Sequence, residues 1–190
     1  WSLMSAKLNL ALGSTVKATA AQEELYKSAQ NLRVPIEDMS KLFVRLVPAM
    51  TEYGYSVSDA LSVTRAMSAA LSLSGATAAE TSSVLLQFSQ AMQAGRLNGA
   101  EFNAVAEGAP VILRAIQKEL LVSRKALKDM GADGEISVNI LTDVLKKYEK
   151  QWVDTAANMP LTFDKAMTKL ENAFKRFLGM SGEAQGTVGL

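Results

Sequence analysis

Apolar residues recur along this chain at intervals of three and four positions, the spacing that places side chains on one face of an α-helix. Two stripes show this spacing most clearly. The first contains Met39, Leu42, Phe43, Leu46, Val47 and Met50, and the second contains Phe163, Met167, Leu170, Phe174 and Phe177. Strand-like alternation of apolar and polar residues is nearly absent. The pattern predicts an all-α fold, and we expect both stripes to pack in a hydrophobic core.

Capping signals divide the chain into helices joined by short turns. Ser56 with Asp59, and Thr77 with Glu80, fit the capping-box pattern, in which two side chains three positions apart satisfy backbone N–H groups at a helix start. Pro48 lies inside the first stripe, where it is expected to kink or end the helix. The predicted helices include residues 57–73, 78–94, 99–107, 137–157 and 162–178. We therefore expect a multi-helix bundle or array of about 7–8 helices.

Small uncharged residues dominate the two helices expected at 57–73 and 78–94. Such residues let helix backbones approach closely, and few charges suggest that protein covers more than one side of each helix. That protein could be the middle layer of this domain, or it could be another chain. For the second case, the candidate self-association surface consists of Ala66, Ala69, Ala70, Ala79, Ser82 and Ser83.

Composition argues against most chemistry. The 190 residues include no cysteine and no histidine, so thiolate ligands and the usual general base near neutral pH are missing. The segment Asp129–Ile140 has a calcium-loop pattern at its first, fifth and sixth positions but lacks the glutamate at the twelfth. We interpret it as a helix end followed by a cap at Ser137. We expect no catalytic, cofactor-binding or metal-binding residues.

Charge and hydropathy also limit the partners. The chain has 20 Lys and Arg against 19 Asp and Glu, a net charge of +1, which predicts no specific nucleic-acid binding. No apolar run approaches the ~20 residues that span a bilayer, so stable membrane insertion is not expected. Lys146, Lys147 and Lys150 alternate with Tyr148 and Trp152, and we expect the rings to pack while the lysines reach solvent.

The last predicted helix permits one more interpretation. Its sequence, "FDKAMTKLENAFKRFLG", places four basic residues beside an aromatic face, which would suit a membrane surface. Asp164 and Glu171 weaken that interpretation. Packing of the aromatic face in a core is the more common use of such a stripe.

Several strings, in this order along the chain, resemble the tape-measure domain of phage and prophage tail tape measure proteins. They are "RVPIEDMSKLF", "YGYSVSDAL", "LSLSGATAAE", "LLQFSQAMQAGRLNGAEFNAVAEGAP", "LKDMGADGEISVNIL" and "MPLTFDKAMTKLENAF". The resemblance extends from about Leu8 to Phe177. The shared order of these strings makes the resemblance fairly specific.

The resemblance implies a structural segment that helps set tail length during assembly inside the tail tube and is released on DNA ejection. It implies no enzymatic activity and no cofactor. The implied partners are other copies of the chain, tail tube proteins, tail assembly chaperones and the baseplate. The implied locations are the virion tail, in the tube lumen, and the bacterial host cytoplasm during assembly. The alternatives are a helical-repeat protein-binding module without catalytic activity and a cell-wall hydrolase fragment.

We expect three parts in the chain: residues 1–14 as a lead-in helix from a longer chain, 15–178 as the helical tape-measure domain, and 179–190 as a flexible glycine-rich tail. Short loops favour a compact domain, whereas a measuring rod should be extended. Our hypothesis is that the isolated segment collapses onto itself or onto copies of itself.

Overall fold

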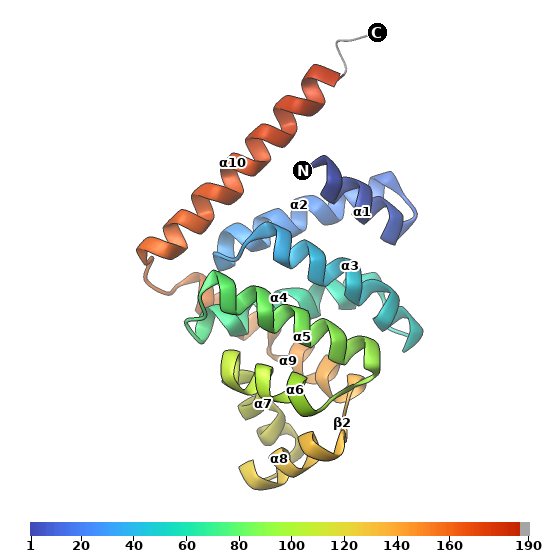
Figure 1. Ribbon diagram of the computed structural model, residues 1–190, viewed down its shortest axis with the longest axis vertical. Helices are drawn as coiled ribbons and strands as arrows, with labels where there is room; N and C mark the ends of the chain where they lie inside the picture. The colour runs from blue at the N-terminus through green and yellow to red at the C-terminus, as the bar shows by residue number, and fades with distance from the viewer. Residues whose placement is uncertain (187–190) are drawn as a thin grey trace.

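The computed structural model describes residues 1–186, with side chains described to residue 180. This range contains ten α-helices and one pair of two-residue strands (Figure 1). In chain order they are α1 (Ser2–Leu12), α2 (Thr15–Leu32), α3 (Ile36–Glu52), α4 (Val57–Leu73), α5 (Ala78–Ala94), β1 (Arg96–Leu97), α6 (Gly99–Gly108), α7 (Pro110–Leu120), α8 (Arg124–Asp133), β2 (Ile136–Ser137), α9 (Val138–Ala157) and α10 (Phe163–Gly186). The predicted all-α fold is confirmed, with ten helices where about 7–8 were expected.

Local capping chemistry sets the starts of α4 and α5. The Ser56 hydroxyl accepts a hydrogen bond from the Asp59 N–H at 3.1 Å, and the Asp59 carboxylate accepts one from the Ser56 N–H at 2.8 Å. Thr77 and Glu80 form the same reciprocal pair. Both capping boxes predicted from the sequence are therefore present. The observed bounds of both helices match the predicted ones.

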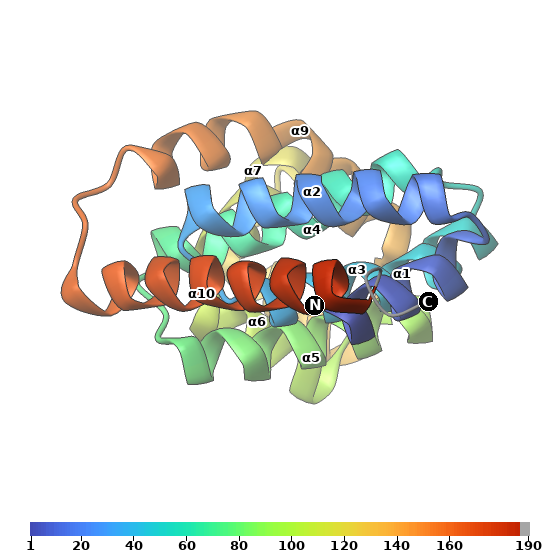
Figure 2. The ribbon, with the colours of Figure 1, turned by 90° about the horizontal axis from the view of Figure 1, so that it is seen from above.

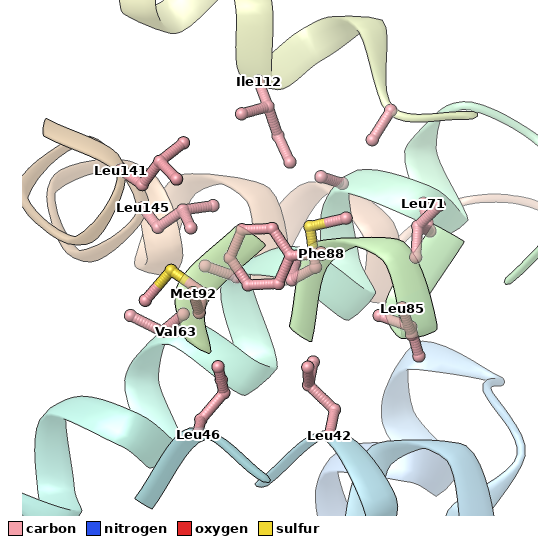
Figure 3. Packing of buried hydrophobic residues seen from close by; sticks show 14 of the residues in the cluster. Leu42, Leu46, Val63, Leu71, Leu85, Phe88, Met92, Ile112, Leu141 and Leu145 are labelled. Atoms are coloured by element: carbon pink, nitrogen blue, oxygen red, sulfur yellow. The ribbon is translucent and has the colours of Figure 1, made fainter. Parts of the chain in front are cut away.

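Helix α4 lies in the middle of the helical array and organises its core. It contacts α2, α3, α5, α7 and α9, and its most extensive neighbour is α9, about 80 residues later in the chain. Arg65 of α4 and Glu149 of α9 form an ion pair with an N–O distance of 2.6 Å. Figure 3 shows side chains of α3, α4, α5, α7 and α9 converging around Phe88, which has no exposed surface.

The first predicted stripe packs as expected. Met39, Phe43, Leu46 and Met50 have no exposed surface and belong to the hydrophobic core. Pro48 does not end the helix, because α3 continues through it to Glu52. Helix α1 joins the same core: Leu8 is fully buried, and α1 contacts both α2 and α3.

The strand pair is a feature that the sequence pattern did not show. Arg96 pairs with Ser137, and Leu97 with Ile136, in an antiparallel arrangement. Leu97 and Ile136 are fully buried, so this short ladder closes the end of the core where α6 and α8 attach.

Helix α10 differs from the prediction at its C-terminal end. It was expected to end at 178, but it continues to Gly186. The last part of the predicted flexible tail, residues 187–190, lies outside the described residues.

Candidate interaction surfaces

The six small residues of the candidate self-association surface lie in two different environments. Ala66, Ala69 and Ala70 have no exposed surface, because α4 is covered by other helices of the same chain. The sequence left open whether this domain or another chain covers the small residues of α4. They pack in this domain's own middle layer. Ala79, Ser82 and Ser83 lie exposed on α5.

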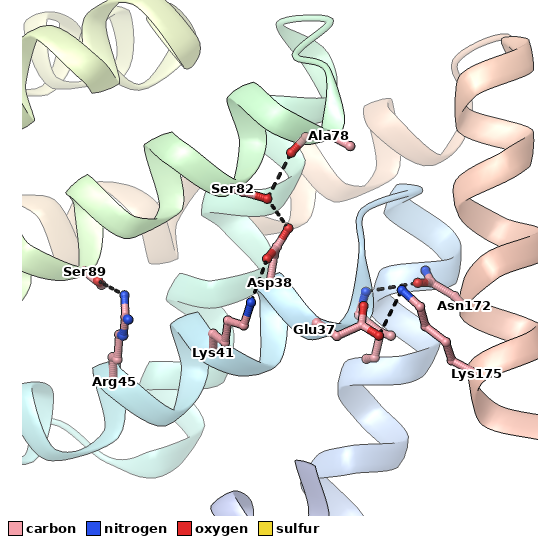
Figure 4. Close-up of polar contacts among 10 residues, drawn as sticks. Glu37, Asp38, Lys41, Arg45, Ala78, Ser82, Ser89, Asn172 and Lys175 are labelled. Atoms are coloured by element: carbon pink, nitrogen blue, oxygen red, sulfur yellow. Dashed lines mark hydrogen bonds and ion pairs between the residues drawn. The ribbon is translucent and has the colours of Figure 1, made fainter. Parts of the chain in front are cut away.

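Two serines of α5, the exposed Ser82 and the buried Ser89, take part in polar contacts with α3. The Ser82 hydroxyl donates to the Asp38 carboxylate, and it also lies 3.1 Å from the Ala78 carbonyl oxygen (Figure 4). Arg45 donates from Nη1 to the Ser89 hydroxyl oxygen at 3.2 Å. The structure therefore does not bring the six small residues together on one surface.

The second predicted stripe is not in the core, and the expectation that it packs there is wrong. Within α10, these side chains remain between 39% and 79% exposed: Phe163, Met167, Leu170, Phe174 and Phe177, which we call the α10 stripe. In Figures 1 and 2 the helix lies at the edge of the array, next to α2 and the end of α1. A large apolar surface on this helix thus faces away from its own domain.

The reason for this orientation is that a polar side chain anchors the opposite face. Asn172 is the one fully buried residue in the described part of α10. Its amide oxygen accepts from the Ile36 N–H at 3.0 Å, and its amide nitrogen donates to the Val34 carbonyl at 2.9 Å. Pro35, the residue preceding α3, has no side chain that can cap the helix. Asn172 therefore caps α3 from a distant part of the chain.

Further polar contacts flank this anchor. Lys175 pairs with Glu37 of α3 at 2.9 Å (Figure 4), and Arg176 pairs with Glu23 of α2 at 3.1 Å. The Arg176 guanidinium also lies over the Tyr26 ring, 4.3 Å from its centroid.

Lys165 holds the N-terminal part of α10 in the same way. Its ammonium donates to the Ala76 carbonyl at 3.2 Å. Burial, and then the nearby positive charge of Arg33, lower the pKa of Lys165 below its ordinary value. The helix is thus attached through polar groups, while its apolar side chains point outward.

Sequence reasoning missed Asn172 as the anchor. The available signal was weak: an asparagine in a helix interior, where its propensity is poor, seven residues from Lys165 and from Gly179. Those three positions share one face of the helix, and all three contact the domain. At Gly179 the contact is so close that an added Cβ would overlap Trp1.

The other predicted local features behave as expected. Trp152 is buried and Tyr148 stacks on it with ring centroids 5.3 Å apart. Each of the neighbouring lysines pairs with a carboxylate: Lys146 with Asp59, Lys147 with Glu119, and Lys150 with Asp154.

The segment Asp129–Ile140 contains the end of α8, a left-handed Gly134 and the Ser137 cap of α9, as interpreted from the sequence. Among residues 1–180, whose side chains the structure describes, there is no cluster of three or more potential metal-ligating side chains. The same range contains no helix with the length and hydropathy needed to cross a membrane.

A comparison with protein families decides the identity of this helical array. The family described as "Tape measure protein" matches residues 1–183, almost the whole chain. The chain belongs to the tape measure protein family. No curated protein and no solved structure matches it.

Family membership assigns the general role of this tape measure chain. Tape measure proteins are structural proteins of phage tails, so the chain has a structural role in the virion tail, and its partners are tail components. For a tape measure chain, the two exposed regions described above, the α10 stripe and the small residues of α5, are the candidate contact surfaces.

Proposed function

We propose that this chain is a segment of a tail tape measure protein that helps set tail length during assembly inside the tail tube. It occupies the tube lumen in the finished virion and leaves on DNA ejection, after assembly in the host cytoplasm. The observation that carries this proposal is the family match over residues 1–183. The chain acts by its length and has no catalytic activity.

The physical properties of the chain support this role. It is almost wholly helical in residues 1–186, and a helix rises by a fixed ~1.5 Å per residue, so residue number can specify a length when the helices are extended along the tube. Its net charge of +1 gives it no strong attraction for DNA in a shared channel.

The partners follow from the same proposal. They are other copies of the chain, tail tube proteins, tail assembly chaperones and the baseplate. The exposed part of the small-residue surface, Ala79, Ser82 and Ser83, stays a predicted contact for one of them. A bulky substitution at Ala79 that alters assembly without changing the stability of the monomer would support it.

The proposed role is tested by removing α4 and α5, residues 57–94, in frame from the parent phage or prophage. Tail lengths are then measured by electron microscopy. We expect shorter tails after the deletion and longer tails after an in-frame duplication of the same residues. Unchanged lengths in both variants would contradict the proposal and indicate a folded binding module instead.

A zymogram tests the absence of catalysis. The purified chain is expected to leave bacterial cell wall intact, and a cleared band would contradict this part of the proposal.

A further inference from the structure

The turn between α7 and α8 departs from the usual chemistry of helix ends. Leu121 is the C-cap of α7, and its backbone is left-handed, with a φ of 55°. Glycine is the usual residue in this conformation, because a side chain brings Cβ close to the following carbonyl oxygen. Helices α1, α5 and α8 follow this rule and end with left-handed glycines. Leu121 therefore holds an unfavourable conformation that a glycine would relieve.

Packing within the chain does not offset this strain. The Leu121 side chain is 90% exposed, the largest fraction among the exposed large apolar residues of 1–180. Arg33 is the other left-handed residue besides glycine in residues 1–186, and its guanidinium donates to the carbonyl oxygens of Ala157 and Pro160. Leu121 has no polar group that could act in the same way. A strained and exposed leucine indicates a contact with another molecule.

Positive charge is concentrated around this turn. Residues 111–128 contain five basic residues and one acidic residue, whereas the net charge of the whole chain is +1, so the rest of the chain is net negative. The acidic residue is Glu119, which is already bound by Lys147 and by the Tyr148 hydroxyl. The basic residues are Arg114, Lys118, Arg124, Lys125 and Lys128.

These basic side chains are available to a partner. Within residues 1–180, Lys125 is the one among the five that pairs with a carboxylate, that of Asp129 at 3.2 Å. Lys118 lies over the Tyr148 ring, 5.8 Å from its centroid, and its side chain is exposed. The turn thus carries a positive charge that its own domain does not neutralise.

Three of the basic residues lie close to Leu121 in space. Arg114 and Lys118 precede it by seven and three positions, which places them on the α7 face that leads to Leu121. Arg124 follows by three positions, a span of at most about 11 Å. We call Arg114, Lys118, Leu121 and Arg124 the Leu121 patch. In Figure 1, α7 and α8 lie at the end of the array opposite α10, so this patch is separate from the α10 stripe.

We propose that the Leu121 patch binds a tail component through an acidic protein surface that offers an apolar pocket for one leucine. The cations attract and orient such a surface, and Leu121 anchors it when its side chain is buried. This inference deepens the proposed function, because it assigns a contact with a tail component to a named surface, and it rests on that proposal for the choice of partners.

A membrane and a nucleic acid are less suitable occupants of the patch. Even a single myristoyl chain gives only marginal membrane binding, and one leucine side chain is much smaller. A nucleic acid would account for the basic residues, since phosphates bind cations and hydrogen-bond donors. It would not account for a strained, exposed leucine among them.

The first test is biolayer interferometry of the purified chain against purified tail components of the parent phage: the tube protein, the assembly chaperones and the baseplate proteins. We expect at least one of them to bind. Leu121→Gly should weaken that binding about 10- to 100-fold, the contribution of one leucine buried in a pocket. Because this substitution also relieves the backbone strain, the variant should melt at a temperature no lower than wild type. Unfolding would then not explain the loss of binding.

Two further variants serve as controls. Leu10→Ala removes a side chain that is 87% exposed on α1, outside the patch, and should bind like wild type. Leu121→Met keeps an apolar anchor of similar volume and should stay within about threefold of wild type. The absence of binding to every tail component, or equal binding by Leu121→Gly and Leu10→Ala, would overturn the proposal.

The dependence of binding on salt tests the charge of the partner. The association rate should fall at least about tenfold when NaCl is raised from about 0.05 M to about 0.5 M, because salt screens the attraction between exposed charges. The double substitution of Lys118→Gln and Arg124→Gln should slow association and reduce this dependence. Association that does not respond to salt would contradict an acidic partner.

Two other probes test the less suitable occupants. They are vesicles of phosphatidylglycerol and phosphatidylcholine, and a DNA duplex. Vesicle binding that requires Leu121, or duplex binding that requires Lys118 and Arg124, would replace the protein with that partner. These measurements use purified components, whereas the ruler role is measured as tail length on phage. The binding proposal can therefore fail while tail length follows residue number, and the reverse can also occur.

Discussion

Two serines on α4 are buried in different ways, although both lie among small residues. The Ser72 hydroxyl donates to the Leu32 carbonyl at 3.0 Å, at the end of α2, where no intrahelical partner is available. The Ser68 hydroxyl has no hydrogen-bond partner within the described part of the chain, and Ser68 is fully buried. Because a buried polar group without a partner is unfavourable, the two sites should respond oppositely to removal of the hydroxyl.

We expect Ser68→Ala to raise the free energy of unfolding by up to about 1 kcal/mol, and Ser72→Ala to lower it by about 1–2 kcal/mol. Urea denaturation of the two variants and wild type measures both effects. A loss of stability in Ser68→Ala as large as that in Ser72→Ala would show that Ser68 has a partner.

The capping carboxylate of α4 gives a pH-dependent prediction. The ion pair with Lys146, followed by hydrogen bonds from the Ser56 N–H and hydroxyl, lowers the pKa of Asp59 to about 2. A lowered pKa stabilises the folded state above the unfolded value of about 3.9, and this contribution is lost as the pH falls toward 2.

The Asp59→Asn variant should therefore have a lower free energy of unfolding than wild type near pH 7. The expected difference is about 1 kcal/mol, as for the loss of other helix caps. This difference should shrink below about pH 4. Lys146→Met removes the ion pair and keeps the capping box, so it should produce a smaller loss. Thermal unfolding from pH 7 to pH 2 measures both variants. A pH-independent difference for Asp59→Asn would contradict the assigned pKa shift.

At the scale of the element, α10 depends on a single buried amide. Removal of the Asn172 side chain leaves the Ile36 N–H and the Val34 carbonyl without their partner. We expect Asn172→Ala to increase hydrogen exchange of α10 amides about tenfold or more, since unpaired buried groups are unfavourable by about 1–3 kcal/mol. Asn103→Ala, at an exposed position of α6, is the control and should leave α10 exchange unchanged. Equal exchange in both variants would show that the ion pairs alone hold α10.

The same element shows how far the sequence could predict the fold. The starts of α4 and α5 depend on residues three positions apart, Ser56 with Asp59 and Thr77 with Glu80, so their bounds could be read directly from the chain. The face on which α10 packs depends on Asn172 and on backbone groups more than 130 residues away. Hydrophobic periodicity located the stripe correctly, but it contains no information on whether the partner of the stripe lies in the same chain.

The small residues of α4 illustrate a related limit. Their composition indicated close packing, which the structure confirms for Ala66, Ala69 and Ala70. The pattern could not distinguish a middle layer from an interface, because both favour small uncharged side chains. Helix α9, from a distant part of the sequence, covers α4 and makes it a middle layer of this domain.

At the scale of the whole molecule, the helices form a folded array with a continuous core, whereas a ruler inside a tube should be extended. We expect small-angle scattering of the free chain, at concentrations low enough to prevent association, to give a radius of gyration of about 20 Å. That value lies slightly above the ~16 Å of a compact domain of this length, because the array is elongated (Figure 1). A single continuous helix of 190 residues would give about 80 Å. A value near the latter would contradict the folded array in solution.

The measurement that tests the central claim most directly is the dependence of tail length on the number of residues removed. Deletions of α4 and α5 (57–94), of α6 to α8 (99–133), and of both segments are introduced into the parent phage or prophage, and tails are measured by electron microscopy. If the chain is part of the ruler, tail length should fall linearly, by about 1.5 Å per residue for a fully helical ruler. Tail lengths that do not change with the number of deleted residues would contradict the proposed role.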